Sequence, residues 1–310
     1  MDLLTVAPSP HIRGAVTTQK IMLLVIIALL PAFVMSVVFF GPRALILTGF
    51  CAAACYFLEF VSRRVMKRAD TTGDLSAIVT GMLLAFNLPS TLPLWMAFIG
   101  CFVAIVIVKQ LFGGLGQNFA NPAITGRIVL MVSFPAAMVG TTPWAVPFSY
   151  NDGIVTSPTP LADTSFSYFD LFIGKCGGSL GETSAAALLL GGIFLVAMRV
   201  INPVTPLAFI GGTALFSLAA GEDPLYQILA GGLMLGAIFM ATDYVTTPIT
   251  TKGKLIFGLG CAVITCLVRF YSSMPEGVSF SILLMNILTP YIDMATRTKA
   301  FGTKQKEAQK

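Results

Sequence analysis

The sequence is short of charged residues. Only 11% of its 310 residues are Asp, Glu, Lys or Arg, whereas 56% are hydrophobic. A soluble globular domain carries about 25% charged residues, so the composition excludes a soluble fold and indicates an integral membrane protein. The net charge of +5 does not indicate nucleic-acid binding, because the cations lie in short loops and tails, where they set membrane orientation.

Metal-ligand and nucleotide-binding patterns are also missing. The chain has a single histidine, His11, and six cysteines without a Cys-x-x-Cys pair, which argues against a zinc site or a four-cysteine iron–sulfur cluster of its own. It contains no Gly-x-Gly-x-x-Gly fingerprint for a dinucleotide. Segment 1–20 lacks the short apolar core and small-residue cleavage site of a signal peptide.

Long apolar runs dominate what is present. A membrane-spanning helix needs about 20 apolar residues. Ten runs are candidate spans: about 21–40, 43–62, 75–88, 92–112, 124–142, 184–200, 204–220, 225–243, 254–271 and 279–296. The third and the eighth are expected to be broken helices, because one ends at Asn87-Leu88-Pro89 and the other runs into 242–248. We predict an all-α polytopic membrane protein of about ten transmembrane helices in one domain, 1–310.

The distribution of cations predicts the orientation. With the N-terminus in the cytoplasm, sixteen of the nineteen Lys and Arg residues fall inside, and only Arg43, Lys175 and Arg269 fall outside. Cytoplasmic segments of membrane proteins carry such an excess. We therefore expect both ends, 1–20 and 297–310, to be cytoplasmic.

The longest connection, 141–183, then lies outside the cell. It carries four acidic residues against the single cation Lys175, together with several aromatic residues. Connections of this length are usually functional. We expect an ordered extracytoplasmic element.

Two features indicate an internal repeat. Gly73-Asp74-Leu75-Ser76-Ala77 resembles Gly181-Glu182-Thr183-Ser184-Ala185. Alternatively, the third span pairs with the eighth in a five-plus-five scheme. Either register relates the two halves by inverted topology, as in many transporters, and both registers remain open.

The outer loop closes on a glycine-rich segment that ends at Thr183. Gly181-Glu182-Thr183-Ser184 before an apolar run is typical of a helix start, so one interpretation is a capping turn. The other is a site for a phosphate-linked group, because glycines allow close approach and a helix N-terminus attracts phosphate. The charge of Glu182 opposes the second interpretation unless this side chain points away.

Several charged groups have more than one interpretation. Glu59 and Arg63 are spaced as an i,i+4 helix pair. Asp74 and segment 118–121 either cap helices or line a cofactor cavity. The basic cluster 63–68 is explained as a topology determinant without any docking role.

An oxygen-rich patch follows the eighth span. It consists of Thr242, Asp243, Thr246, Thr247 and Thr250. An acidic residue beside a membrane span is a functional candidate by default, and hard cations prefer oxygen ligands. The alternative is a helix terminus in which Asp243 pairs with Lys252 or Lys254.

A family resemblance favours the cofactor interpretation. Gly178–Ala185 looks like the flavin-attachment segment of a family of membrane proteins, and Ser9–Arg13, Asn118–Ala123 and Met240–Thr250 resemble the same family. The likeness spans the whole chain. The family includes the D-type component of the Rnf complex, an ion-translocating ferredoxin:NAD oxidoreductase, and the B-type component of the sodium-pumping NADH:quinone reductase. The ten-helix layout and the absence of a long N-terminal extension favour the first.

The resemblance implies cofactors at particular residues. It implies FMN linked through its phosphate to Thr183, with Gly181, Glu182 and Ser184 around the attachment point. The commoner attachment signature has alanine where Glu182 stands. The resemblance also implies a second, non-covalent flavin, riboflavin. A flavin contact is thus a further interpretation of the patch, and its candidates are Asp243, Thr246 and Thr247.

The resemblance also implies a setting and partners. It places the chain in a prokaryotic cell (inner) membrane, as one component of a translocase with no complete active site alone. The expected partners are Rnf proteins of the C, G, E, A and B types, above all the extracytoplasmic flavin-bearing G type, and the lipid bilayer. The implied function is electron relay coupled to Na⁺ or H⁺ translocation. The alternative is an inverted-repeat secondary transporter or channel without a redox cofactor.

Overall fold

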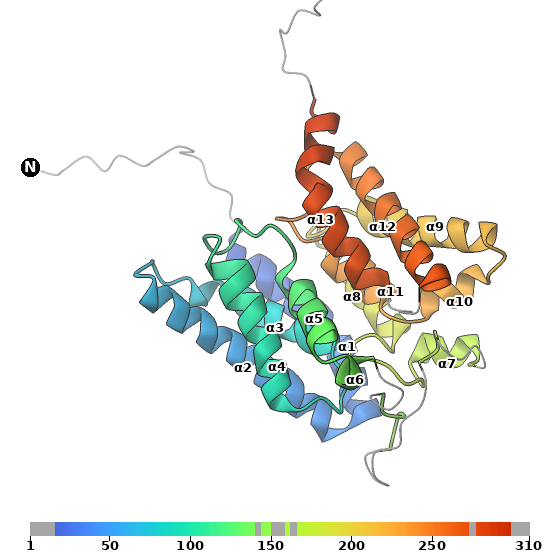
Figure 1. Cartoon of the computed structure of the whole chain (residues 1–310), viewed down its shortest axis with the longest axis horizontal. Helices are drawn as coiled ribbons and strands as arrows, with labels where there is room; N and C mark the ends of the chain where they lie inside the picture. Colours follow the sequence, from blue (N-terminus) through green and yellow to red (C-terminus); the bar gives the residue numbers. More distant parts are fainter. Residues whose placement is uncertain (1–15, 140–143, 150–158, 162–165, 273–276, 299–310) are drawn as a thin grey trace, which may run out of the picture.

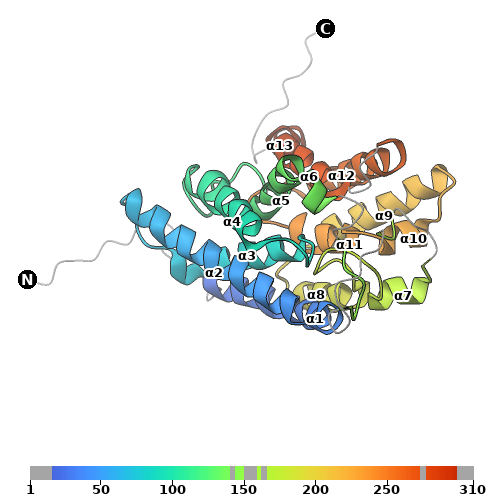
Figure 2. The same ribbon diagram turned by 60° about the horizontal axis from the view of Figure 1, so that its bottom comes forward.

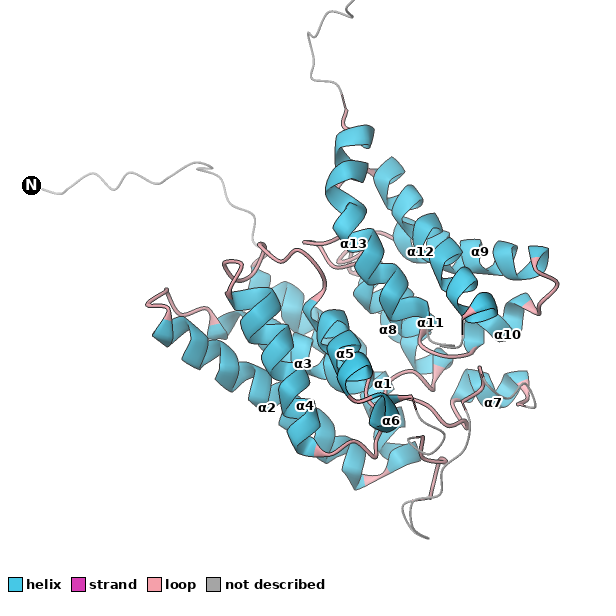
Figure 3. Cartoon of the chain, viewed as in Figure 1, coloured by secondary structure: helices cyan, strands magenta, loops and turns pink. Residues whose placement is uncertain are grey.

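The computed structural model describes residues 16–139, 144–149, 159–161, 166–272 and 277–298. Every regular element in these ranges is a helix, which confirms the predicted all-α class (Figure 3). The outermost parts of both predicted cytoplasmic ends, 1–15 and 299–310, and three stretches of the predicted outer loop lie outside the described residues.

The described chain forms a series of helices of very unequal length (Figure 1). In chain order they are α1 (Thr18–Phe40), α2 (Pro42–Val65), η1 (Thr72–Asp74), α3 (Ser76–Phe86), α4 (Leu94–Phe102), η2 (Val103–Gln110), α5 (Pro122–Ser133), α6 (Pro135–Met138), α7 (Tyr168–Ile173), α8 (Ala185–Ala197), α9 (Val204–Ala219), α10 (Pro224–Leu229), α11 (Leu233–Leu235), η3 (Gly236–Met240), α12 (Thr251–Tyr271) and α13 (Gly277–Thr296).

Each of the ten predicted spans contains a helix. In the described part of the chain, four helices are long and apolar enough to cross a membrane by themselves, namely α1, α2, α12 and α13. The shorter apolar helices α3, α5, α8 and α9 and the continuous α4–η2 segment account for most of the rest. The chain is therefore a helical membrane protein in which several segments are half-length helices.

The breaks predicted at the ends of the third and eighth spans are confirmed, since α3 ends at Phe86 and η3 at Met240, but a further break inside the eighth span was not predicted. Helix α3 ends at Phe86, two residues before Leu88-Pro89. The eighth span is divided into α10, α11 and η3, because Ala230 is extended and Gly231 has a φ of +68°. The fifth span, predicted as one helix over 124–142, is corrected. Helix α5 ends at Ser133, since Phe134 precedes a proline and leaves the helical region.

The helices form two groups. Helices α2, α3, α4 and α5 lie on one side and α9, α12 and α13 on the other, and the two groups meet where α1 packs on α8 and α5 packs on α13 (Figures 1 and 2). Small residues allow the closest contacts. A Cβ on Gly81 of α3 would lie 2.6 Å from the Cys51 carbonyl oxygen of α2, and one on Gly191 of α8 would lie 2.2 Å from that of Ala28 in α1. Glycine is typical of such membrane helix contacts.

Two segments, η2 and η3, are π-helices. In η2 the Leu111 amide donates to the Val106 carbonyl, and in η3 the Ala241 amide donates to the Gly236 carbonyl at 2.7 Å. Both bonds span five residues in place of the four of an α-helix. Such widened turns are rare and frequently lie at functional sites.

Candidate functional site

The glycine-rich segment before α8 binds to the broken end of α3. The backbone amides of Leu180 and Gly181 donate to the carbonyls of Leu88 and Phe86, at 3.1 and 2.9 Å. Only glycine fits at position 181, because a Cβ there would lie 2.3 Å from the Phe86 Cβ. The segment therefore satisfies carbonyls that the end of α3 leaves without helical partners.

Ser184, one residue after Thr183, caps α8. Its Oγ accepts a hydrogen bond from the Ala187 amide at 3.4 Å. Thr183 precedes the cap, and only 4% of its surface is exposed. Helix α3 has 11 residues and a length of about 16 Å, so the end of the predicted outer loop is recessed into the bundle beside the half-helix.

A small cavity of about 20 Å³ adjoins Thr183. Its wall includes Cys176, Gly177 and Gly178 on one side and Thr159, Pro160 and Leu161 on another. The Tyr226 hydroxyl of α10 donates to the Pro160 carbonyl at 2.9 Å and holds this wall in place. Burial, with the carboxylates of Asp170 and Glu182 nearby, raises the pKa of the Cys176 thiol to about 12. The thiol is thus neutral and a poor nucleophile.

Glu182 forms a buried ion pair beside this cavity. Its Oε1 lies 2.6 Å from the guanidinium of Arg127 in α5, and the same guanidinium nitrogen donates to Asn87 Oδ1 at 2.5 Å. All three side chains are buried. The negative charge next to Thr183 is therefore compensated inside the protein. Sequence reasoning treated Arg127 only as an inner-side cation and missed this contact.

A second cavity of about 100 Å³ lies at the other end of α3. Polar side chains in its wall are Ser76, Thr80, Lys109, Asn118, Asn121, Thr242 and Asp243. The remaining wall is largely apolar and comes from α1, α3, α5, α8, η3 and adjoining loop residues. We call it the inner cavity, because the prediction from the cations places these helix ends in the cytoplasm. It shares no lining residue with the Thr183 cavity.

The predicted oxygen-rich patch forms a turn beside the inner cavity. Thr246 Oγ1 donates to Asp243 Oδ2 at 3.2 Å, and Thr247 Oγ1 donates to the Ala241 carbonyl at 2.8 Å. Of these three residues, only Asp243 lines the cavity. Within the described ranges Asp243 forms no ion pair with Lys252 or Lys254, so the alternative pairing from the sequence is wrong.

The sequence allows Asn118 and Asn121 either to cap a helix or to line a cavity, and the structure gives Asn121 both roles. Its Oδ1 caps α5 by accepting from the Ala123 amide at 3.0 Å, and its Nδ2 donates to the Met240 carbonyl at 3.3 Å. Asn118 Oδ1 is buried and has no hydrogen-bond partner among the described residues. An unsatisfied buried acceptor in a cavity wall is unusual and is available to a ligand donor.

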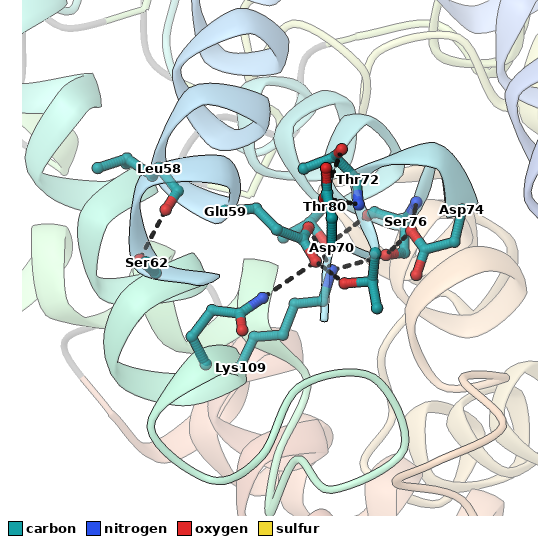
Figure 4. A network of polar contacts seen from close by, with 11 residues as sticks. Leu58, Glu59, Ser62, Asp70, Thr72, Asp74, Ser76, Thr80 and Lys109 are labelled. Atoms are coloured by element: carbon teal, nitrogen blue, oxygen red, sulfur yellow. Dashed lines mark hydrogen bonds and ion pairs between the residues drawn. The ribbon is translucent and has the colours of Figure 1, made fainter. Parts of the chain in front are cut away.

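A buried ion network lies at the same end of the bundle (Figure 4). Glu59 pairs with Lys109 of η2 at 2.7 Å, and fewer than 2% of either side chain is exposed. The predicted Glu59–Arg63 pair is therefore wrong, because the packing of α2 against η2 brings in a cation 50 positions away. Asp74 accepts from the Ser76 amide and hydroxyl, at 2.8 and 2.5 Å.

The two groups of predicted site residues thus lie at two separate places. Gly181, Glu182, Thr183 and Ser184 surround the small cavity, the α3 break and the α8 cap. Asp243 with its neighbours lies at the inner cavity. Helix α3 joins the two places, with Ser76 at one end and Phe86 at the other.

Comparison with known proteins gives a consistent result. A profile of the NQR2, RnfD, RnfE family matches residues 5–302. The chain is 45% identical over 317 residues to the D component of the Na⁺-translocating ferredoxin:NAD⁺ oxidoreductase complex of Acetobacterium woodii, with 99% of this chain and 98% of the relative covered. It is 42% identical to the D component of the proton-translocating ferredoxin:NAD⁺ oxidoreductase complex of Clostridium ljungdahlii, with 98% of each covered. It is 37% identical to the D component of an ion-translocating oxidoreductase complex of Stutzerimonas stutzeri, with 94% and 93% covered.

Proposed function

The chain belongs to the NQR2, RnfD, RnfE family, and we propose that it is the flavin-carrying membrane subunit of an ion-translocating ferredoxin:NAD⁺ oxidoreductase complex. The names of relatives matched over nearly their full length support this assignment. As one part of an oxidoreductase, it would relay electrons while other subunits meet ferredoxin and NAD⁺.

We propose that Thr183 carries FMN through a phosphodiester bond. The surroundings support this chemically. Gly177 and Gly178 add no side chains to the cavity wall, Ser184 caps α8, and the Arg127 ion pair compensates the charge of Glu182. A phosphate near a helix N-terminus is favoured by free amides and by the helix dipole. When bound, the flavin supplies the redox chemistry, and the protein supplies binding and orientation.

Loading of the flavin requires movement of the cavity wall. About 20 Å³ is room for one water-sized group, less than a phosphodiester needs. The part of the wall formed by Thr159–Leu161 is held to α10 by a side-chain hydrogen bond, which the Tyr226 hydroxyl donates to the Pro160 carbonyl. Displacement of this wall opens Thr183 to a flavin transferase, whereas the Gly181 side is fixed to α3 by two backbone bonds.

We assign the second, non-covalent flavin, riboflavin, to the inner cavity. The Asn118 amide oxygen lacks a described partner and would accept from an N–H or a hydroxyl of the ligand. Asp243 and Lys109 add charged groups, and the apolar wall suits an aromatic ring. The cavity volume of about 100 Å³ is too small for the tricyclic ring of a flavin. The helices α1 and η3 must therefore separate when the ligand binds.

The finer architecture is part of the same proposal. Ten membrane segments in two inverted five-helix halves agree with the α1–α8 and α5–α13 contacts, which join corresponding helices of a five-plus-five scheme. In this arrangement both chain ends are cytoplasmic in a prokaryotic cell membrane. The Thr183 loop then faces an extracytoplasmic flavin-bearing partner of the G type.

The transported ion in this proposal is either Na⁺ or H⁺. Relatives of similar identity carry the names of a sodium-translocating and a proton-translocating complex, so similarity does not select one ion. Electron transfer by the intact complex in sodium-free buffer distinguishes the two, because a sodium-coupled complex stalls there.

The observation that carries the proposal is Thr183 between a glycine wall and a helix cap. The test is ultraviolet fluorescence of the denatured protein after expression with a flavin transferase. Wild type and a Ser179→Ala control should fluoresce, and Thr183→Ala should not, with a matching loss of mass. A non-fluorescent wild-type band of unmodified mass would favour the transporter without a redox cofactor. Full complex activity in Thr183→Ala would favour a purely structural role.

A further inference from the structure

A continuous series of hydrogen bonds links Asp74, Ser76 and Lys109 (Figure 4). Asp74 is half-buried and accepts from the Ser76 hydroxyl at 2.5 Å. The same Ser76 oxygen accepts from Lys109 Nζ at 2.6 Å. Ser76 and Lys109 both line the inner cavity, and Asp74 does not. The series therefore has one end near solvent and the other at the cavity.

Glu59 fixes the ammonium group at the cavity end. Its Oε2 lies 2.7 Å from Lys109 Nζ. Its Oε1 accepts from Gln110 Nε2 at 3.0 Å and from Thr71 Oγ1 at 3.1 Å. Because both carboxylate oxygens are engaged, the position of Glu59 is determined from three directions. A lysine ammonium has three donors, and Glu59 and Ser76 account for two of them.

A buried pair that served packing alone would need no connection to the surface. Membrane proteins place ionisable groups inside the bundle at high cost, and chains of such groups mark proton relays and ion pathways. The donors around Glu59 also argue against a sodium site, because its oxygens already accept N–H and O–H groups. No cluster of three or more His, Cys, Asp or Glu suited to a metal ion occurs among the described residues.

We propose that Asp74, Ser76 and Lys109 form a proton relay that delivers protons from the inner face to whatever basic group occupies the inner cavity. Lys109 gives one Nζ proton to a nitrogen or oxygen of the ligand or to a water. The Ser76 hydroxyl then turns from Asp74 to the neutral amine, passes its proton to Nζ and takes one from protonated Asp74. Asp74 regains a proton from solvent. The sum is one proton moved, with no electron transferred, and Glu59 acts as a positioning residue.

Other charged and titratable groups surround Lys109. From α2 come Glu59 and the Cys55 thiol, and Arg63 at the end of that helix lies against Gly114, whose amide donates to the Lys109 carbonyl. Asp243 faces the same cavity from the segment after η3. Arg68 donates to the Gln110 carbonyl next to Lys109, at 2.8 Å. The carboxylates attract the positive charge of the ammonium, and the arginines repel it.

The test uses the whole complex in proteoliposomes. Ser76→Ala removes the middle of the relay. Lys109→Arg keeps the charge and the ion pair, but a guanidinium does not release its proton. The matched control is Ser62→Ala, since Ser62 is buried in α2 near Glu59, does not line the inner cavity, and its hydroxyl donates to the Leu58 carbonyl at 2.6 Å. Electron transfer from ferredoxin to NAD⁺ is measured over a pH series and in D₂O.

The relay predicts that Ser76→Ala and Lys109→Arg each lower turnover by about 10²-fold, the order of a lost general acid. It also predicts an altered pH profile and a changed solvent isotope effect for both, with Ser62→Ala close to wild type. Turnover and pH profiles of Ser76→Ala and Lys109→Arg that match those of Ser62→Ala would overturn the relay. If either variant fails to assemble, Asp74→Asn at the half-exposed end gives the same comparison.

The inference rests on the proposed function, and the two are tested separately. In-gel fluorescence on the same samples reports the flavin at Thr183, which is remote from the relay. Absence of that fluorescence counts against the proposed function. If the relay variants keep this fluorescence and their turnover and pH profile are unchanged, the result counts against the relay alone.

Discussion

The ion pair between Arg127 and Glu182 gives the sharpest stability prediction. The two groups are 2.6 Å apart and at least 96% buried. Removing one partner of such a pair leaves a buried charge without compensation and costs about 3–5 kcal/mol. We expect Arg127→Met and Glu182→Leu each to lower the free energy of unfolding by this amount. The double variant leaves no charge and should recover most of the loss, because apolar replacement of a buried pair is often neutral.

The assay is reversible SDS titration of the full-length protein in mixed micelles, followed by circular dichroism. Lys252→Met is the control, because Lys252 is exposed and forms no described ion pair, and surface changes of this kind stay within about 0.5 kcal/mol. The coupling energy between Arg127 and Glu182, calculated from the wild type, the two single variants and the double variant, should be several kcal/mol. Single variants that cost less than about 1 kcal/mol, or a double variant whose loss is the sum of the two, would refute the compensation of Glu182 by Arg127.

Three further predictions concern single residues. Gly181→Ala places a Cβ 2.3 Å from Phe86, so we expect a loss of about 1–3 kcal/mol and weaker in-gel flavin fluorescence, with Gly73→Ala, which meets nothing within 4 Å, unchanged. Asn121→Ala removes the α5 cap and should cost about 1 kcal/mol, measured by the same SDS titration. With a pKa of about 12 against the usual 9.0, Cys176 as the sole cysteine should resist maleimide at neutral pH until the protein unfolds, and rapid labelling of the folded protein would contradict its burial. Because the folded state keeps this proton longer, the thiol lowers stability as pH rises from about 9 to about 12 and has no effect below that window.

The sequence predicts local features of this protein well. Apolar runs locate the helices, and the end of α3 at Phe86 follows from Pro89 nearby, whereas the break at Gly231 inside the eighth span was not predicted. Proline affects the backbone conformation of only a few neighbouring residues, so its effect on a helix can be predicted from the local sequence.

Contacts between distant segments could not be predicted in the same way. Within its own helix, Arg63 at i+4 is the expected partner of Glu59. Glu59 instead forms its ion pair with Lys109, because α2 packs against η2. Arg127 and Glu182 are 55 positions apart, and their pairing depends on the glycine-rich segment bonding to α3. To predict either ion pair, one must know which helices are neighbours. Hydrophobic periodicity does not give this information.

The two π-helices have a consequence for the wall of the inner cavity. A π-helix holds one residue more than an α-helix of similar length and ends. The surplus residue can sit at different positions along the segment while the flanking turns stay where they are. Since η2 carries Lys109 and η3 leads into Asp243, both charged sides of the cavity belong to segments whose register is not determined by their length. A change of register there would turn a charged side chain without moving α5, α12 or α13.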